Sequence, residues 1–332
     1  MKYKTLGKSG IKVSEIGFGA WTIALDWWGK KIEDDEAKRM LKRAYDVGIN
    51  FFETGDMYGK GKSEKLIGEA FKGMRNEVVI STKYGYEFEN VAQISHNELP
   101  QRFDPLFTEH ALRNSLARLQ TDYIDVYGLH NPKMHHIKDD VIFNTLDNKI
   151  KEGVIGTCQI ALGPAIGWIN EGLEAMNRRY VSAVQTVYNI LEQTPGNELI
   201  ENAEKKNVGI LVRVPDASGI LTGKVKADTK IDEKDHRSIR KGEWIKSALD
   251  KVEQLRPIAN RNGLSIAELA IKFILTKKGI SSVMPTVISI EEIEQFAEMS
   301  DGKYLSDPDM EEIASLYNTW PPYEIKSTVQ AA

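Results

Sequence analysis

Apolar, β-branched runs alternate with amphipathic helical patterns along the chain, and this alternation constrains the fold more than any other feature. Short apolar runs between turn signals are typical of buried strands, whereas apolar residues spaced three and four apart indicate helices. The pattern predicts eight strands, near residues 15–20, 50–55, 77–83, 122–130, 154–161, 181–188, 208–214 and 281–287. Alternating strands and helices predict an α/β protein with a parallel sheet. The sheet is either a closed (β/α)8 barrel or an open doubly wound sheet.

The composition narrows the class of protein. The chain has 332 residues and 41% of them are hydrophobic, which is enough for a sizeable core. A net charge of -4 argues against a surface for nucleic acid or for an anionic membrane. One cysteine excludes an internal disulfide, and no apolar run approaches the roughly 20 residues of a membrane span. The N-terminus MKYKTLG has no apolar run behind its charges, unlike a signal peptide, so we expect a cytoplasmic protein.

Residues 50–70, NFFETGDMYGKGKSEKLIGEA, place an acid and a tyrosine directly after a predicted strand. A helical pattern begins near Ser63, so Glu53 and Tyr58 are expected at the carboxyl end of the strand and on the loop that follows. Reacting groups collect at this end in parallel α/β folds. A tyrosine is a plausible proton donor there if a neighbour lowers its pKa from about 10.

Four segments, in this order and spacing, carry a family resemblance. They are residues 1–21 (MKYKTLGKSGIKVSEIGFGAW), 50–70, 81–83 (STK) and 115–132 (SLARLQTDYIDVYGLHNP). The set resembles the aldo-keto reductase family over roughly residues 1 to 300. The resemblance implies a single (β/α)8 TIM barrel with an N-terminal β-hairpin and a C-terminal tail, and it decides against the open sheet. We find no linker or repeat that would mark a second domain, so residues 1–332 are expected to form one domain.

The resemblance also implies an enzyme that interconverts carbonyls and alcohols by hydride transfer with a nicotinamide cofactor. Tyr58 corresponds to the family's acid, and Lys83 would hold a positive charge beside it that lowers its pKa. Glu53 would pair with Lys83, and His130 would orient the carbonyl or relay the proton. Glutamate stands at position 53 where the family normally has aspartate, so its carboxylate must reach ~1.5 Å further or its side chain must fold back. An offset of that size can weaken catalysis.

Three predicted strands would supply contacts to the nicotinamide. On the fifth strand the family usually has Gly-x-Ser-Asn, and this chain has Gly156-Thr157-Cys158-Gln159. Gln159 keeps an amide donor and acceptor, while Cys158 is either a weak donor or a small buried filler. Gln185 matches a family glutamine that contacts the nicotinamide. Arg213 stands where many members stack an aromatic ring, and a guanidinium plane can also stack or bind phosphate.

Two further segments are expected at the far end of the cofactor. Residues 217–224 (ASGILTGK) fit the family's loop that straps the pyrophosphate, where Gly219 and Gly223 allow close backbone approach. The last strand and helix align with the segment that holds the 2′-phosphate in NADPH-using members, but Thr286 and Glu292 stand where bases are usual. Lys224 is a basic residue that could substitute. We expect NADP(H) as the cofactor, with use of NAD(H) left open.

Aromatic residues suggest the wall of a substrate pocket. Trp21, Trp27 and Tyr86 would suit small aldehydes, ketones or sugars without a strongly anionic group, although Trp27 could instead plug the rim of the barrel. The pair His135-His136 lacks further ligands at metal spacing, so no metal site is predicted.

Three longer stretches interrupt the rhythm of strands and helices. Residues 86–107 and 215–242 follow strands and are candidates to cover the substrate or the cofactor. The tail, residues 300–332, either caps the pocket or packs on the barrel.

The alternative function is a regulatory or accessory protein of the same fold that binds the cofactor with weak catalysis, as potassium-channel accessory subunits do. The intact set of Tyr58, Lys83 and His130 argues for the enzyme. The oligomeric state and the identity of the carbonyl or alcohol substrate are open from the sequence.

Overall fold

The computed structural model describes residues 1–26, 29–89, 99–163, 168–229, 231, 235 and 242–321. Its main sheet is parallel and eight-stranded, with neighbours in the order β10-β9-β8-β7-β6-β5-β4-β3. The strands are β3 (Phe18–Gly19), β4 (Phe51–Glu53), β5 (Val79–Tyr84), β6 (Ile124–His130), β7 (Ile155–Ala161), β8 (Val181–Val187), β9 (Gly209–Arg213) and β10 (Ile280–Met284).

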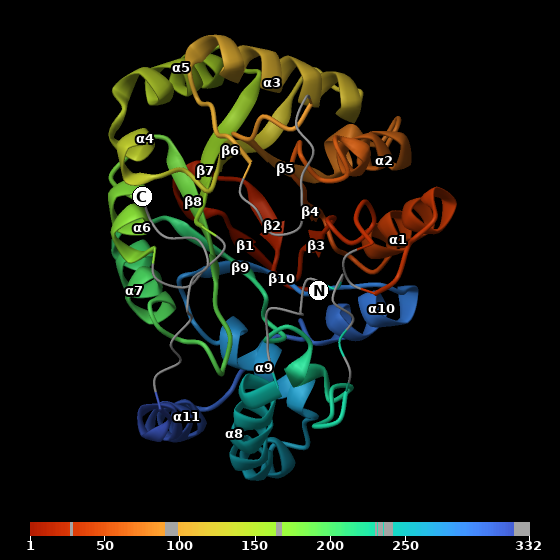
Figure 1. The fold of residues 1–332 in the computed structure, drawn as a ribbon, viewed down its shortest axis with the longest axis vertical. Coiled ribbons are helices and arrows are strands. Elements are labelled where there is room, and N and C mark those ends of the chain that lie inside the picture. The colour runs from red at the N-terminus through yellow and green to blue at the C-terminus, as the bar shows by residue number, and fades with distance from the viewer. Residues whose placement is uncertain are drawn as a thin grey trace.

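The two edges of the sheet meet. Ile16, just before β3, forms a parallel bridge with Val283 of β10, and the Gly17 amide donates to the Val283 carbonyl at 2.9 Å. The sheet is therefore a closed barrel, and the prediction of a (β/α)8 fold is confirmed (Figure 1). Each predicted strand overlaps an observed one, and only β5 and β10 extend beyond the predicted range, by one residue each. The last strand ends at Met284, earlier than expected, because Pro285 has no amide hydrogen for the ladder.

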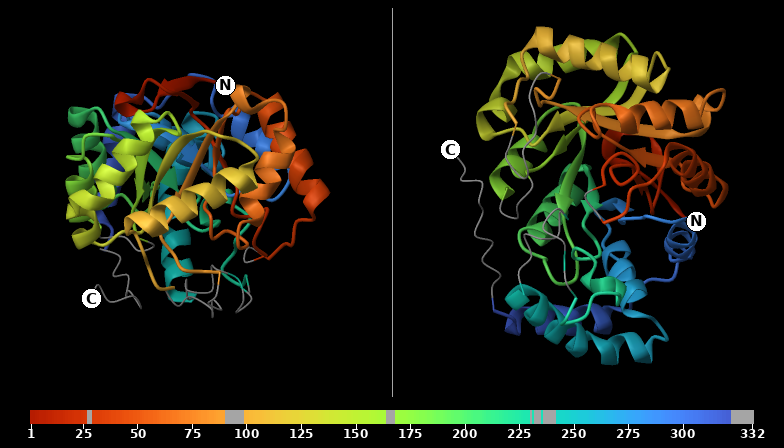
Figure 2. Two further views of the ribbon diagram at one scale, coloured as in Figure 1. Left: turned by 90° about the horizontal axis from the view of Figure 1, so that it is seen from above. Right: turned by 45° about the vertical axis from the view of Figure 1, so that its right-hand side comes forward.

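Helices surround the barrel in both views of Figure 2. They are α1 (Asp34–Asp46), α2 (Lys62–Ala70), α3 (Pro105–Leu119), α4 (Met134–Lys138), α5 (Asp140–Lys151), α6 (Ile169–Ala175), α7 (Gly196–Lys206), α8 (Gly242–Arg261), α9 (Ile266–Leu275), α10 (Ile290–Glu298) and α11 (Asp307–Thr319), with short 3-10 helices η1 (Gly7–Ser9), η2 (Arg75–Glu77) and η3 (Ile220–Thr222). Local sequence starts several of them. Asp104 caps α3 by accepting from the Phe107 amide at 3.1 Å, with Pro105 in the first turn.

Alternation along the strands divides the core into an inner and an outer part. One face of the strands packs against the helices, and the other fills the barrel. The N-terminal hairpin of β1 (Tyr3–Thr5) and β2 (Lys12–Ser14) contributes the buried Leu6 and Val13 to the inner cluster, where they join Phe51 and Val126. The predicted hairpin thus plugs the end of the barrel where the strands begin. The opposite end, where the strands finish, remains for a site.

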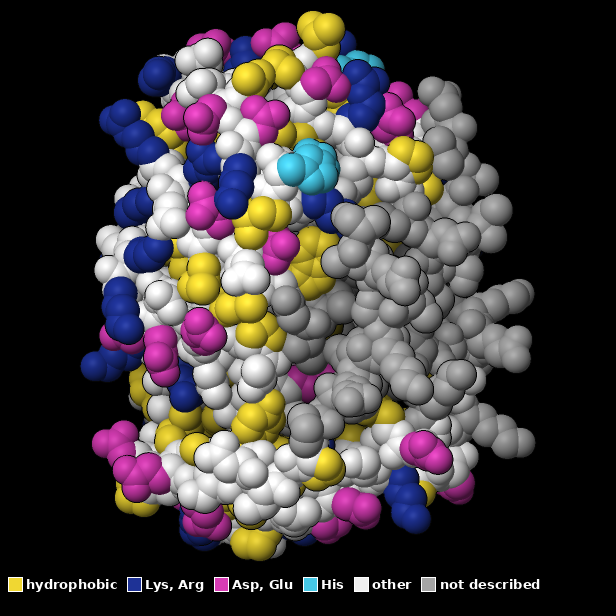
Figure 3. Space-filling model, turned by 60° about the vertical axis from the view of Figure 1, so that its left-hand side comes forward, with side chains coloured by type: hydrophobic (Ala, Val, Ile, Leu, Met, Phe, Trp, Pro, Cys, Tyr) yellow, Lys and Arg dark blue, Asp and Glu magenta, His cyan; other side chains and the backbone are white. Residues whose placement is uncertain are grey.

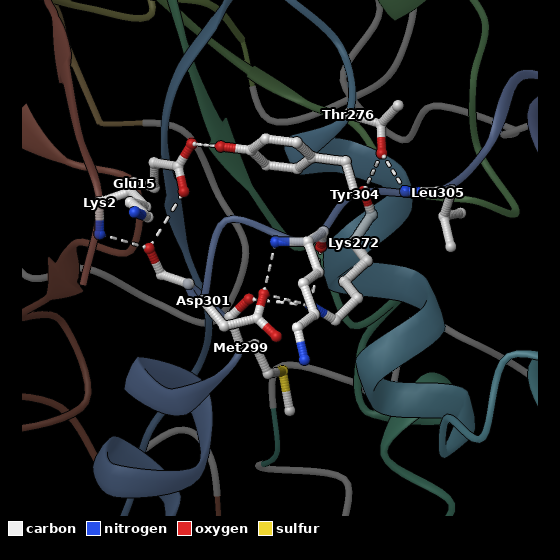
Figure 4. A network of polar contacts seen from close by, with 10 residues as sticks. Lys2, Glu15, Lys272, Thr276, Met299, Asp301, Tyr304 and Leu305 are labelled. Carbon is white, nitrogen blue, oxygen red and sulfur yellow. Dashed lines mark hydrogen bonds and ion pairs between the residues drawn. The ribbon is translucent and has the colours of Figure 1, made fainter.

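A polar network ties the chain's last third to this plugged end (Figure 4). Glu15 is fully buried, accepts from the Tyr304 hydroxyl at 2.7 Å and pairs with Lys4 at 3.2 Å. Lys272 of α9 pairs with Asp301 at 2.7 Å. Bonds to charged groups are stronger than neutral ones, so this network stabilises the fold away from the strand ends.

The described part of the tail packs on the barrel. The Tyr317 hydroxyl of α11 accepts from the amides of Gln193 and Thr194 at 3.2 and 3.1 Å. The indole of Trp320 donates to Gln254 of α8 at 2.9 Å. Figure 1 shows α11 beside α8 at one end of the molecule. These contacts favour packing over a capping role for residues up to 321.

The surface is mixed in charge. On the face of Figure 3, basic and acidic side chains are interspersed over the part that is not grey. Within the described ranges, none of the helices combines the length and apolarity needed to cross a bilayer.

Candidate active site

Four predicted side chains come together where three neighbouring strands end. Glu53 is the last residue of β4, Lys83 is the penultimate residue of β5, and His130 ends β6. Tyr58 lies on the loop after β4, where its amide donates to the Gly55 carbonyl at 3.0 Å. Parallel strands in a barrel direct their carboxyl ends to one rim, so successive strands bring these residues together.

Lys83 is the centre of the cluster. Its side chain is 1% exposed, forms an ion pair with Glu53 and donates to the Thr54 carbonyl at 2.7 Å. Its ammonium nitrogen lies 4.6 Å from the centroid of the Tyr58 ring. Burial acts to lower the pKa of Lys83, but Glu53 and Tyr58 outweigh it, so the pKa is raised and the ammonium persists. Glu53 therefore reaches Lys83 despite its extra methylene.

The environment of Tyr58 differs from the expectation. Burial raises the pKa of Tyr58 above its usual value, and the neighbouring carboxylate of Glu53 adds to this effect. Lys83 pulls in the opposite direction, as predicted, but does not overcome the other two causes. The expectation of a net lowered pKa for Tyr58 is therefore wrong, and the phenol keeps its proton at neutral pH.

His130 is 7% exposed and lies between two tyrosines. Its ring centroid is 6.0 Å from that of Tyr58 and 5.0 Å from that of Tyr86, with interplanar angles of 83° and 77°. Burial, helped by the positive charges of Lys83 and Arg213, holds the pKa of His130 well below its usual value. The imidazole is therefore neutral near pH 7.

The two predicted contacts on β7 are wrong in position. Ala161, rather than Gln159, pairs with His130 at the rim. Gln159 is fully buried below the rim and donates its amide to the Ser81 hydroxyl at 2.8 Å. Cys158 is fully buried in the layer between strands and helices, which matches the interpretation as a small filler. The motif match could not reveal how β7 pairs with β6. In that pairing β7 continues for two residues beyond Gln159, so that Ala161 reaches the rim.

Gln185 and Arg213 do lie near the rim. Gln185 of β8 is 3% exposed and pairs with Ala161. Arg213 ends β9 and donates to the carbonyls of Leu162 and Gly163, the former at 3.0 Å. Burial lowers the pKa of Arg213, while Tyr58 opposes that change. The guanidinium thus belongs to the same electrostatic environment as the four clustered side chains.

The residue after Arg213 has an unusual backbone. Val214 has a φ of 56°, a left-handed conformation that costs a β-branched residue energy. Its carbonyl accepts from the side-chain amide of Asn189 at 3.1 Å, which helps hold this conformation. Strained backbone is often found at functional sites, and no feature of the sequence pointed to Val214.

The predicted strap also has left-handed residues. Ala217, Ser218 and Gly219 follow one another with φ of 49°, 58° and 90°. Gly219 directly precedes η3, and the strap ends close to α10 because Lys224 pairs with Glu292 at 2.6 Å. The two predicted cofactor residues therefore bind each other.

The end of β10 and the start of α10 form the other side of this contact. Glu292 also accepts from the Ile288 amide at 2.8 Å. Thr286 lies two residues after β10 and is partly exposed.

Two of the three predicted pocket residues, Trp21 and Tyr86, lie among the described residues. Trp21 lies two residues after β3, at the same end of the barrel as His130. Tyr86 contacts His130, as described above, whereas Trp27 lies outside the described residues. The sequence reasoning missed Asn131, whose amide donates to the Tyr86 hydroxyl at 2.7 Å. Its place directly after His130 was the available signal.

Comparisons with known proteins agree with the barrel fold. The chain is 29% identical over 301 residues to a probable voltage-gated potassium channel subunit beta of Oryza sativa subsp. japonica, and the match covers 86% of each protein. It is 28% identical over 326 residues to the aldo-keto reductase YhdN of Bacillus subtilis (strain 168), covering 95% of this chain and 93% of YhdN.

A solved structure has the same fold. The holo form of the aldo-keto reductase AKR11C1 from Bacillus halodurans superposes with a TM-score of 0.78 and 25% identity, covering 95% of this chain and 96% of that one. The profile described as "Aldo/keto reductase family" matches residues 15–318, from the start of the barrel to the last described helix. The chain therefore belongs to the aldo/keto reductase family.

Proposed function

We propose that this protein is a nicotinamide-dependent oxidoreductase that interconverts a small carbonyl and its alcohol, with Tyr58 as the proton donor. The observation that supports it most is the cluster of Tyr58, Lys83, Glu53 and His130 at the ends of adjacent strands. Membership of the aldo/keto reductase family supports carbonyl and alcohol chemistry in general.

The described rim is compatible with a nicotinamide. Small residues, Gly19 and Ala161, end β3 and β7, which leaves room for a flat ring against the strand ends. Gln185 carries an amide that could hold the ring's carboxamide, and Arg213 could bind a phosphate. The left-handed backbone around Gly219 suits a loop that approaches a pyrophosphate closely. When bound, a reduced nicotinamide supplies the hydride to the carbonyl carbon.

The protein's own residues would manage the proton. Tyr58 donates its phenolic proton to the carbonyl oxygen as negative charge develops there. Lys83, held as an ammonium by Glu53, stabilises the phenolate that remains. His130 is neutral, so it can orient the carbonyl oxygen without adding a second positive charge. In alcohol oxidation the same groups act in reverse, and Tyr58 must first lose its proton.

We also propose that the protein binds NADP(H) with only a modest preference over NAD(H). At the position expected for the 2′-phosphate, Glu292 is negative and already binds Lys224, the nearest predicted base. A carboxylate repels a phosphate but accepts hydrogen bonds from the ribose hydroxyls of NAD(H). Lys224 is 68% exposed, so it can turn towards a phosphate when one is present.

Turnover tests the proposal directly. The purified protein should reduce an activated benzaldehyde and small aliphatic aldehydes with NADPH and, less efficiently, with NADH. The plant relatives named as channel subunits raise the alternative of an accessory protein that binds the cofactor with weak catalysis. Tight cofactor binding without turnover of any carbonyl in such a panel would favour that alternative.

A further inference from the structure

The orientation of His130 needs an explanation. Histidines at functional sites are usually oriented by a hydrogen bond to the second ring nitrogen. The Nδ1 atom of His130 is buried and has no hydrogen-bond partner in the described part of the chain. The ring instead lies between Tyr58 and Tyr86, each at nearly a right angle to it. Edge-to-face contact of this kind is a favourable aromatic geometry.

Tyr86 is itself held on the rim by polar contacts. Asn131 donates its side-chain amide to the Tyr86 hydroxyl at 2.7 Å, within a buried region. The backbone of Asn131 is restrained in turn. Its φ is left-handed at 52°, and its backbone amide donates to the Ala161 carbonyl at 2.8 Å. Gln101 pairs with Tyr86 in a short antiparallel bridge and donates to the carbonyls of both His130 and Asn131 at 3.0 Å.

A cavity beside Tyr86 explains why a restraint on its ring matters. A cavity of about 390 Å³ lies between residues 86–89 and α3, and Tyr86 is part of its wall together with Phe88 and Phe107. Tyr58 and His130 are not among the described residues that line this cavity, whereas Asp56 and Tyr86 are. Tyr86 thus borders open space, and the bond from Asn131 opposes movement of its ring into that space.

We propose that Tyr86 is a positioning residue that sets the orientation of His130, and that Asn131 holds Tyr86 in that role. The inference rests on the proposed function, because His130 matters only if the protein acts on carbonyls. It assigns Tyr86 a role beyond that of a pocket wall. Loss of the ring lets the imidazole rotate, and a displacement of about 1 Å at a reacting group can cost about 100-fold in rate.

A set of variants tests this role through kinetics. Tyr86→Leu should lower kcat by about 10- to 100-fold and leave the KM for the cofactor within about twofold. Tyr86→Phe keeps the ring but removes the hydroxyl that Asn131 binds, so its kcat should lie between those of the wild type and Tyr86→Leu. Phe88→Leu is the matched control, since Phe88 belongs to the same small apolar cluster and the same cavity. An equal loss of kcat in Phe88→Leu would overturn the proposal in favour of general packing.

A double-mutant cycle separates positioning from direct substrate contact. If Tyr86 acts through His130, then Tyr86→Leu should change kcat by less than about twofold in a His130→Ala background. A loss as large as in the wild-type background would contradict the proposal, because Tyr86 would then act on the substrate itself.

Nuclear magnetic resonance of the ring provides a readout that does not need turnover. The chain has six histidines, and the signal of His130 can be assigned by its absence from His130→Ala. The signal should shift or broaden in Tyr86→Leu and stay unchanged in Phe88→Leu. An unchanged signal in Tyr86→Leu would refute the positioning role even in an active enzyme. A wild type without turnover would refute the proposed function, while the spectra would still decide whether Tyr86 orients His130.

Discussion

Replacing Glu53 by aspartate shortens the side chain that reaches Lys83 by one bond, about 1.5 Å. A contact of normal length, near ~2.8 Å, would open to roughly 4.3 Å. With an effective dielectric constant of about 20, the attraction weakens by about 2 kcal/mol, equivalent to roughly 30-fold in an equilibrium. Both groups are buried, Lys83 at 1% and Glu53 at 6% side-chain exposure, so water cannot readily screen the loss. The pKa of Lys83 should fall, and its ammonium should stabilise the Tyr58 phenolate less well.

We therefore expect Glu53→Asp to lower kcat for aldehyde reduction by about 10- to 30-fold, with the KM for cofactor nearly unchanged. The assay follows reduced cofactor by absorbance at saturating aldehyde. Glu36→Asp is the matched control, because Glu36 pairs with Lys30 at 2.9 Å on the surface, where such pairs contribute little. A Glu53→Asp enzyme as active as the wild type, or more active, would show that catalysis does not depend on the reach of Glu53.

Three further outcomes follow from the same contacts. Because burial keeps the pKa of Tyr58 above its usual value, the rate of aldehyde reduction should stay constant from about pH 6 to about pH 9, and the rate of alcohol oxidation should rise with pH. Rates of both reactions measured over this pH range check this, and a rate of oxidation that falls with pH would contradict it. Lys224→Ala should weaken NADPH binding about tenfold more than NADH binding, whereas Glu292→Gln should strengthen the preference for NADPH. Fluorescence quenching measures both affinities. A wild-type preference for NADPH above about a thousandfold would refute the reasoning. Asp56 is 1% exposed, and burial followed by repulsion from Glu64 raises its pKa well above the usual value. The unfolded chain therefore loses the Asp56 proton at lower pH than the folded protein does, and the stability of the fold decreases as the pH rises from about 4. Asp56→Asn should accordingly raise the melting temperature at pH 7 more than at pH 4. An equal change at both pH values would show that the pKa of Asp56 does not differ between the folded and unfolded states.

Much of the fold could be predicted because its signals are local and repeated. The strand that ends at Glu53 and the one that ends at His130 each combine an apolar run with a following polar turn. In parallel folds this pattern already places side chains on one rim. The catalytic candidates were found for the same reason, since each lies within a few residues of a predicted strand end.

The predictions that were wrong depend on contacts between distant parts of the chain, which no local sequence pattern reveals. Cys158 and Gln159 matched a short motif, but their position depends on the register of β7 against β6. The raised pKa of Tyr58 results from desolvation by surrounding segments, which a pairwise view of Lys83 could not include. Pairing between distant positions was equally hidden, and Lys224 and Glu292 are 68 residues apart.

The measurement that tests the central claim most directly is the turnover of Tyr58→Phe. This change removes one hydroxyl and keeps the ring between Lys83 and His130. Because general acid catalysis is typically worth about 100- to 10,000-fold, we predict that aldehyde reduction falls by at least about 100-fold while the Kd for cofactor stays within about twofold. A Tyr58→Phe protein that keeps more than about half of the wild-type turnover would remove Tyr58 from the mechanism and contradict the account.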